Sequence, residues 1–494
     1  MNPLSGKVLM SGERASFEAA RQSPVTVLQV GEGNFLRGFF DWMIHRCREQ
    51  NLFSGGIAVT QPRPSGKAKM ETLAAQEGLY TLVTRGLDQG EIVQRKEIVS
   101  VFSEVVDPYS EWPRFGELAR SPSLRFVVSN TTEAGLAYRP EPLAEGRPIQ
   151  SFPGKMTWLL YQRYLALGAR ADSGLIFLPC ELVARNGDEL KRCVLRYAED
   201  WSLPAPFLSW VTGHNRFLNS LVDRIVTGHP GEAAAGAWFA EWGYTDAMLN
   251  TAEPYHLWAI EAEPGLDREL PLRQAGLNVH WVDDLEPYQL RKVRILNGAH
   301  TLMAPLALLS GVTYVREAME HARFGPFVRE AVEQEIIPAV GLPPEALLTY
   351  AATVYERFMN PFIDHRLSDI AMNSLSKFKT RLLPTLLYYA SGGMPLPSRI
   401  VEALAGLLRY YRVRRDEEGF VGRTLAGMPC RVRDDEASLA SIAAAWDGEK
   451  PLHAKIADLL GLDGIWGQDL SGIEGLASSI AALISVWEAG ESDE

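Results

Sequence analysis

The chain has 494 residues, of which 46% are hydrophobic and 22% charged, and its formal net charge is -12. This length allows two or three domains with substantial cores. The acidic balance and the lack of a Lys/Arg-rich run argue against nucleic acid and anionic membranes as partners. The opening residues lack a signal-peptide pattern and no apolar run reaches about 18 residues, so we expect no membrane span. The four scattered cysteines form no Cys-x-x-Cys pair, which predicts neither a disulfide framework nor a sulfur-ligated zinc site and fits the cytoplasm.

After an N-terminal extension, residues 1–24, the first predicted elements are a buried strand at 25–30 and a helix at 34–49. Gly31 and Gly33 lie between them. Two glycines at this place let the backbone approach a pyrophosphate near a helix N-terminus, although an ordinary strand–turn–helix corner has the same pattern.

The remaining pattern predicts an α/β domain followed by a helical one. Apolar strands at 57–60, 124–129 and 175–178 alternate with other segments, which indicates a mostly parallel sheet. Residues 79–85 and 91–102 resemble an inserted β-hairpin or meander. The pattern changes after a last strand at 278–284, and helices are expected at 287–306, 324–337, 344–358, 380–391, 397–412 and 434–446. We therefore predict a Rossmann-like domain, 25–285, with an inserted β-meander, and a mostly α-helical domain, 286–494.

One segment of the second domain carries catalytic chemistry. Lys292, Asn297 and His300 place an amine, an amide and an imidazole within nine residues. On an α-helix His300 lies about 80° and Asn297 about 140° around the axis from Lys292, so a long lysine can reach both. In an apolar site the amine suits general acid/base catalysis and the amide stabilises an alkoxide. The alternative is a solvated Lys, a surface Asn and a satisfied His.

This Lys-x4-Asn-x2-His segment resembles the signature of the mannitol dehydrogenase family of polyol-specific long-chain dehydrogenases. Further runs at 27–37, 129–135, 179–187, 221–225 and 373–381 extend the resemblance over roughly residues 25 to 480. It implies a zinc-independent NAD enzyme in which Lys292 is the acid/base, Asn297 binds the reacting oxygen and His300 orients the substrate. The implied cofactor residues are Gly31, Glu32, Gly33, Asn34, Phe35, Leu36, Arg37, Gln61 and Asn130.

The cofactor itself is left open by the residues alone. The second strand of a nicotinamide-binding fold usually ends in an acid that holds the ribose hydroxyls, but here Gln61 and Arg63 follow it. Gln61 suits a ribose hydroxyl and Arg63 suits a 2′-phosphate, so NAD rather than NADP rests on the resemblance.

Order and spacing are most similar to the branch of the family that reduces keto-uronates such as D-tagaturonate to aldonates. The candidate substrate residues are Asn186, Asp223, Lys377 and Arg381. In mannitol dehydrogenases an Asn soon after the equivalent cysteine completes the oxyanion site, whereas here Glu181 follows Cys180, and Asn186 is the possible substitute. Lys377 and Arg381 share a helical face and suit a substrate carboxylate. Fructuronate reductase, mannitol 2-dehydrogenase and a non-catalytic sugar-acid sensor remain alternatives, and oligomeric state stays open.

Overall fold

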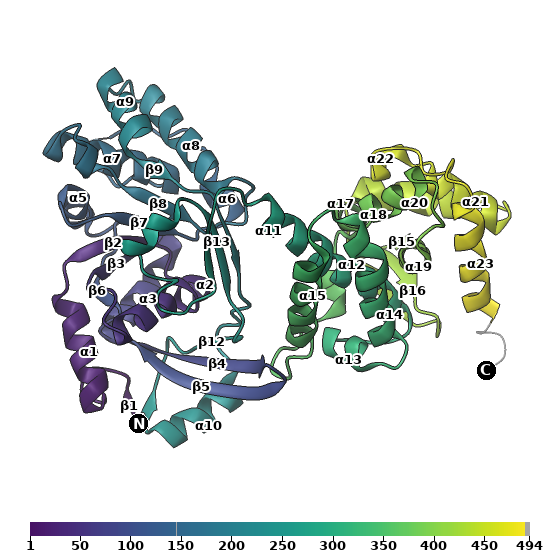
Figure 1. The fold of residues 1–494 in the computed structure, drawn as a ribbon, viewed down its shortest axis with the longest axis horizontal. Coiled ribbons are helices and arrows are strands. Elements are labelled where there is room, and N and C mark those ends of the chain that lie inside the picture. Colours follow the sequence, from purple (N-terminus) through teal and green to yellow (C-terminus); the bar gives the residue numbers. More distant parts are fainter. Residues whose placement is uncertain (145, 490–494) are drawn as a thin grey trace. The chain divides into compact units, whose positions relative to one another are not determined.

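A computed structural model describes residues 1–144 and 146–489 of the chain (Figure 1). It divides into two compact units, Met1–Leu285 and a second that begins at Glu286. The division falls where the hydrophobic pattern of the sequence changes. None of the helices in the described ranges is long and apolar enough to cross a membrane.

A six-stranded parallel sheet forms the centre of the first unit. Its order is β6-β3-β2-β7-β8-β9, which is 3-2-1-4-5-6 when these strands are numbered along the chain, the order of a dinucleotide-binding sheet. Most of the strands are continuous apolar runs because both faces of the sheet are covered. They are β2 Val25–Val30, β3 Gly56–Thr60, β6 Phe102–Val105, β7 Phe126–Ser129, β8 Ile176–Pro179 and β9 Arg216–Phe217. The predicted α/β Rossmann fold is confirmed.

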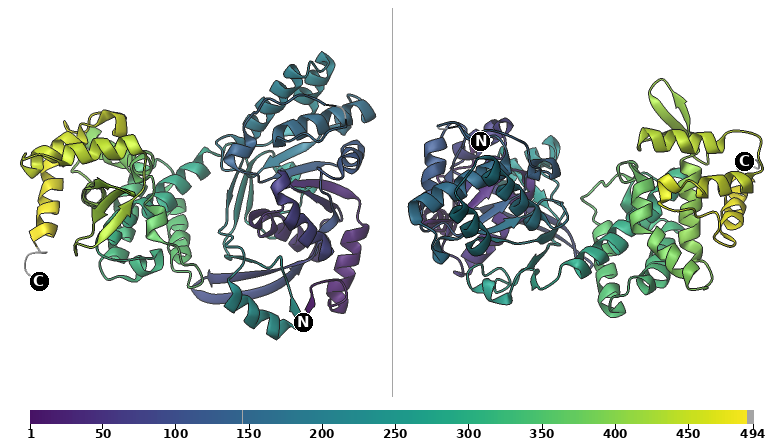
Figure 2. Two further views of the ribbon diagram at one scale, coloured as in Figure 1. Left: turned by 180° about the vertical axis from the view of Figure 1, so that it is seen from behind. Right: turned by 90° about the horizontal axis from the view of Figure 1, so that it is seen from above.

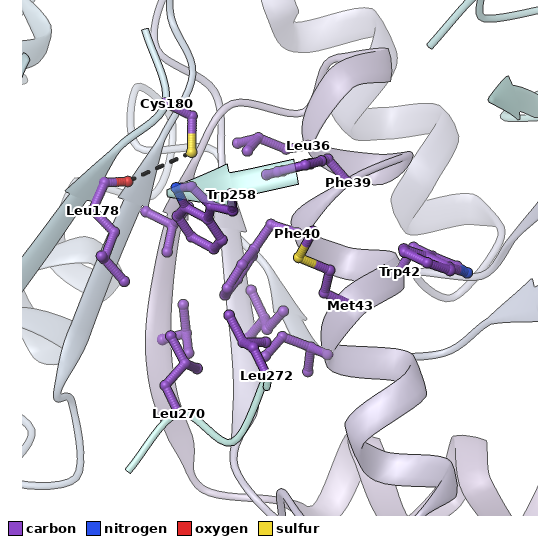
Figure 3. Packing of buried hydrophobic residues seen from close by; sticks show 14 of the residues in the cluster. Leu36, Phe39, Phe40, Trp42, Met43, Leu178, Cys180, Trp258, Leu270 and Leu272 are labelled. Carbon is purple, nitrogen blue, oxygen red and sulfur yellow. Dashed lines mark hydrogen bonds between the residues drawn. The ribbon is translucent and has the colours of Figure 1, made fainter. Parts of the chain in front are cut away.

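Helices cover both faces of this sheet (Figures 1 and 2) and bury a separate apolar cluster on each. Figure 3 shows one cluster, in which Phe39 and Phe40 pack against Trp258 with ring centroids 5.6 and 5.9 Å apart. Burial of each such side chain stabilises the fold by about 1.5–3 kcal/mol. The helices of this unit are α1 Ser11–Gln22, α2 Asn34–Arg37, α3 Phe40–Glu49, α4 Lys67–Ala75, α5 Trp112–Arg120, α6 Glu133–Leu136, α7 Phe152–Leu167, α8 Asn186–Asp200, α9 Ala205–His214 and α10 Glu232–Trp242.

The inserted hairpin is present, with bounds that differ from the prediction. β4 Tyr80–Asp88 pairs with β5 Glu91–Val99 along nine residues, and the turn at Gln89 and Gly90 has positive φ at both positions, as a two-residue hairpin turn requires. Phe102, predicted within the hairpin, instead begins β6 of the main sheet. β12 Asn250–Ala252 adds to β4, and β10 Ser220–Asp223, β13 Leu257–Glu261 and β14 Val279–Val282 form another small sheet.

The second unit packs helices around α12, Asn297–Leu309, which is buried along most of its length. A Cβ at Gly406 of α19 would lie 2.4 Å from Leu306 Cδ2, so the glycine allows these two helices to pack closely. The apolar residues of the predicted helix over 287–306 favour burial along its whole length, but Leu290 and Val293, before α12, are only half-buried. A three-stranded sheet that we did not predict follows α19. α13, α14, α16, α17 and α19 pack against α12. The other elements of this unit, with their bounds, are α11 Glu286–Arg291, α13 Val315–Glu320, α14 Phe324–Glu330, α15 Pro344–Phe358, α16 Leu367–Ile370, α17 Ser374–Arg381, α18 Leu383–Ser391, α19 Ser398–Tyr410, β15 Arg414–Asp416, β16 Gly419–Arg423, β17 Pro429–Val432, α20 Glu436–Trp446, α21 Leu452–Leu460, α22 Asp463–Trp466 and α23 Leu476–Ala489.

Candidate active site

The turn after β2 needs its two glycines for different reasons. Gly31 has φ +135°, its N–H donates to Thr60 O at 2.8 Å, and a Cβ there would lie 2.9 Å from Asn130 O. Gly31 is therefore required by the fold itself. Gly33 has an ordinary φ of -69°, and a Cβ there would meet no atom within 4 Å. The space in front of Gly33 is open to a ligand that approaches the backbone.

The helix after this turn is not continuous, contrary to the prediction of one helix over 34–49. It breaks into α2 and α3 at Gly38 and Phe39. Close packing accompanies the break, since a Cβ at Gly38 would lie 2.7 Å from Val226 Cγ1. A four-residue helix contributes little dipole, so an anion at this turn would depend on the backbone N–H groups themselves.

Several residues of the predicted cofactor-binding segment support the turn from the protein interior. Arg37 is buried, its Nε donates to Glu32 O at 3.3 Å, and one terminal nitrogen donates to Asn34 Oδ1 at 2.7 Å. Leu36 is buried in the core, and Phe35 stacks on Phe39 with centroids 4.9 Å apart. Leu36 and Arg37 therefore hold the turn in place and face the protein interior. Burial also raises the pKa of Glu32.

Gln61, at the end of β3, is fully buried and its amide is oriented by a residue that sequence reasoning missed. Its Nε2 donates to Asp107 Oδ1 at 3.0 Å, and Asp107 follows the neighbouring strand β6. Since an ionised carboxylate only accepts, the amide nitrogen must face it. The buried Oε1 then has no hydrogen-bond partner among the described residues. Gln61 thus offers a ribose hydroxyl an acceptor and not a donor. Nearby, Asn130 Nδ2 donates to Cys180 O at 2.8 Å and ties the end of β7 to β8.

Asn186 is a brace inside the first unit, so its predicted role toward substrate is not supported. Its Nδ2 donates to the carbonyl oxygens of Pro179, Glu181 and Ser220, and its Oδ1 accepts from the N–H groups of Gly187 and Ser220. The donors and acceptors of the amide are therefore all used within the protein, and none is left for a ligand. Asp223 is buried at the end of β10, and the Arg224 guanidinium beside it donates to Glu253 O and Gly38 O.

The segment that carries Lys292, Asn297 and His300 is not a uniform α-helix. Residues 292–296 form one turn of π-helix, in which the N–H of Asn297 donates to Lys292 O five residues earlier. This wider turn holds one residue more than an α-turn, so Asn297 lies near the face of Lys292 and not about 140° away. His300 is three residues further along α12 and shares the face of Asn297. The π-turn therefore improves the predicted convergence of the three side chains.

His300 is buried among aromatic and basic side chains of the second unit. Its ring stacks on Phe358 with centroids 4.4 Å apart and meets His365 edge-on at 4.9 Å. Burial, and then the charges of His365, Arg381, Arg357 and Lys377, hold the pKa of His300 well below its usual value. Its buried Nε2 has no hydrogen-bond partner in the described part of the chain.

Lys377 and Arg381 lie on one side of α17, as predicted. Lys377 Nζ donates to Ile370 O at 2.8 Å, and Arg381 donates to Thr301 Oγ1 at 3.1 Å, one α-helical turn after Asn297. Burial lowers the pKa of both side chains. Arg357, 8% exposed, adds a third cation to Lys377 and Arg381 near His300, whereas burial lowers the pKa of His365 and favours its neutral form. The sequence patterns predicted neither Arg357 nor His365, because both come from a distant part of the sequence that carries no motif.

No group of three or more His, Cys, Asp or Glu side chains in residues 1–144 and 146–489 has a geometry that could hold a metal ion. The cysteines Cys47, Cys180, Cys193 and Cys430 are all unpaired thiols.

Two domain families match this chain: the mannitol dehydrogenase Rossmann domain over residues 25–274 and the mannitol dehydrogenase C-terminal domain over residues 284–484. The altronate oxidoreductase of Bacillus subtilis (strain 168) is 42% identical over 465 residues, 94% of this chain and 93% of that protein. The altronate oxidoreductase of Halalkalibacterium halodurans is 40% identical over 491 residues, 98% of this chain and 95% of that protein.

Among solved structures, the Pseudomonas fluorescens mannitol 2-dehydrogenase in ternary complex with NAD and D-mannitol matches with a TM-score of 0.66. It is 20% identical, and the match covers 96% of this chain and 94% of that one. At this identity the likeness establishes the shared fold alone. The two domain matches and the relatives at 40% and 42% identity span both units, and the chain therefore belongs to the mannitol dehydrogenase family.

Proposed function

We propose that this protein interconverts D-tagaturonate and D-altronate with NAD as the cofactor. The altronate oxidoreductases, at about 40% identity over nearly the whole chain, support this activity. The structural observation that carries the proposal is the group of cations around His300. A neutral polyol needs only hydroxyl partners, whereas a uronate carboxylate loses water in a closed site and needs a cation able to replace it.

The substrate carboxylate would be held by Lys377 and Arg381. Each carries a lowered pKa because burial removes water from its charged form, and a bound carboxylate would offset that loss. Arg381 also contacts Thr301 and Asn297 O, so binding of the acid group is linked to the helix that carries the catalytic residues. Arg357 adds a further positive charge to this side of the site.

Lys292, Asn297 and His300 would act on the reacting carbonyl. Lys292 donates a proton to the oxygen during reduction and takes it back during oxidation, while the Asn297 amide donates a hydrogen bond to the developing alkoxide. His300 is neutral at physiological pH because burial lowers its pKa, so one ring nitrogen accepts and the other donates to substrate hydroxyls. In this site the lysine takes the polarising role that zinc has in other alcohol dehydrogenases.

The cofactor would bind on the first unit, at the carboxyl edge of the parallel sheet, and would supply the hydride. Three features fit it: the open space at Gly33, the unpaired acceptor Gln61 Oε1 and a cavity of about 90 Å³ lined in part by Pro62 and Thr131. A ribose hydroxyl can donate to Gln61 Oε1, but a 2′-phosphate near neutral pH carries little proton to donate. Gln61 therefore favours NAD, although Arg63 is exposed next to it.

The test is oxidation of NADH in the presence of D-tagaturonate, D-fructuronate and D-fructose, each repeated with NADPH. We expect the highest kcat/KM for D-tagaturonate with NADH. Equal kcat/KM for D-fructose would contradict the role of the cationic group and favour a mannitol dehydrogenase, and a preference for D-fructuronate would favour the sister reductase. Binding of D-tagaturonate without any turnover would indicate a sugar-acid sensor.

A further inference from the structure

Lys155, in α7, is a buried lysine for which the catalytic proposal has no use. It is 1% exposed, and its Nζ has close oxygen acceptors in Pro62 O at 2.9 Å, Tyr109 Oη at 2.6 Å and Gln150 O at 3.0 Å. A fourth oxygen, Ile149 O, lies at 3.4 Å. An ammonium has three donors and no acceptor, so the three nearest oxygens match its full hydrogen-bonding capacity. Nζ also lies 4.7 Å from the centroid of the Tyr109 ring.

These contacts join three segments that are far apart in the sequence. Pro62 follows β3, Tyr109 follows β6, and Gln150 precedes α7. Tyr109 strengthens the connection, since its hydroxyl also donates to Pro62 O at 2.8 Å. The loop that follows Gln61 is therefore held by hydrogen bonds from the ammonium group of Lys155 and the hydroxyl of Tyr109.

The same loop forms part of a cavity wall. Pro62, Arg63 and Gln150 line the cavity of about 90 Å³, together with Thr131 and Thr132 after β7. The carboxyl ends of β3 and β7 flank β2, the strand that leads into the glycine turn. In a sheet of this order the cofactor lies across the carboxyl ends of the strands, and the residues after the second strand meet the adenosine ribose.

We propose that Lys155 is a positioning residue for the adenosine half of the cofactor, and that its positive charge is what holds the Pro62 loop in the binding shape. This inference rests on the proposed function, because it presumes that NAD binds at this edge. Without the ammonium, Pro62 O and Gln150 O lose their shared donor, and the loop loses its anchor to α7.

The charge of Lys155 makes the effect depend on pH. Burial is the main cause that lowers the pKa of Lys155 to about 7, and the carboxylate of Glu141 opposes the shift. Above this pH the amine becomes neutral, so it loses one of its three donors and the positive charge that attracts the surrounding oxygens. The loop should therefore loosen as pH rises from about 6 to 9. Tyr109, the phenol that contacts Lys155, is itself titratable, and Asp107, Arg63 and Glu32 are the other titratable groups near it.

The experiment compares wild type with Lys155→Met by calorimetric titration with AMP, with nicotinamide mononucleotide and with NADH. We expect Lys155→Met to raise the Kd of AMP at least tenfold at pH 6.5 and to leave nicotinamide mononucleotide unchanged. The wild-type Kd of NADH should rise between pH 6 and 9, and that of Lys155→Met should stay flat. Lys191→Met, on α8, is the matched control and should bind AMP like wild type.

Tyr109→Phe serves if Lys155→Met does not fold, because it keeps the ring and removes one acceptor of Lys155 and one donor to Pro62. A weaker loss of AMP affinity in the same direction is expected. If wild type binds NADH and the folded variants bind AMP as tightly as wild type at every pH, the inference is wrong and the proposed function stands. If wild type binds neither nucleotide, the cofactor assignment falls, and this inference falls with it.

Discussion

Valine at Gly33 provides a clean test of where the cofactor binds, because the same change two residues earlier would damage the fold. Gly33 has φ -69°, and a Cβ there meets no atom within 4 Å, so Gly33→Val should change the free energy of unfolding by no more than about 0.5 kcal/mol. Gly31→Val combines φ +135° with a Cβ 2.9 Å from Asn130 O. Backbone strain alone costs about 1–3 kcal/mol, before any displacement of Asn130.

The two variants should therefore separate folding from binding. In Gly33→Val the new methyl groups occupy the space through which a phosphate would approach the backbone, and we expect the Kd of NADH to rise at least 100-fold, about 2.7 kcal/mol. Fluorescence titration with NADH measures this, and thermal unfolding measures stability. Gly213→Val, in α9, is the control, since its Cβ also meets no atom within 4 Å. A Gly33→Val protein with wild-type Tm and wild-type NADH affinity would refute the assignment of the cofactor to this turn.

Three further variants test the remaining reasoning. Lys292→Ala should lower turnover by about 10²–10⁴-fold with little change in the Kd of NADH. Added primary amines should restore part of the lost turnover. Turnover close to wild type from pH 6 to 10 would exclude Lys292 as the acid/base. Lys377→Ala should raise KM for D-tagaturonate at least tenfold, about 1.4 kcal/mol. Lys379→Ala is the control and should leave KM unchanged, because the Lys379 side chain lies against Gly467. Equal KM values for the two variants would exclude Lys377 from the carboxylate site. Asp41→Asn should become more stable relative to wild type as pH rises, because burial raises the pKa of Asp41 in the folded protein to about 8. Between about pH 4 and 8 the unfolded chain releases this proton while the folded protein keeps it, so wild type loses stability over this range. We expect the Tm advantage of Asp41→Asn to grow by at least about 2–4 °C from pH 5 to 9, and a constant difference would show that Asp41 ionises normally.

The sequence by itself determined the features that depend on neighbouring residues. The apolar runs that became β2, β3, β7 and β8 are visible because a strand buried on both faces must be apolar throughout. The alternation of these strands with other segments predicted a mostly parallel sheet. Lys292, Asn297 and His300 could be predicted as one site because one short segment carries all three. In each case the physical cause acts within about ten residues of chain.

Only the tertiary structure decided which distant groups share a site. His365 and Arg357 surround His300 through the packing of separate helices, and no local pattern marks either residue. Lys155 reaches Pro62 across 93 residues of sequence. Asn186 is a further example. Its spacing from Cys180 suggested a substrate ligand, but in the fold its amide forms hydrogen bonds with the backbone of Ser220, 34 residues away. A buried polar group must find its partners wherever the fold places them, and sequence spacing does not record those places.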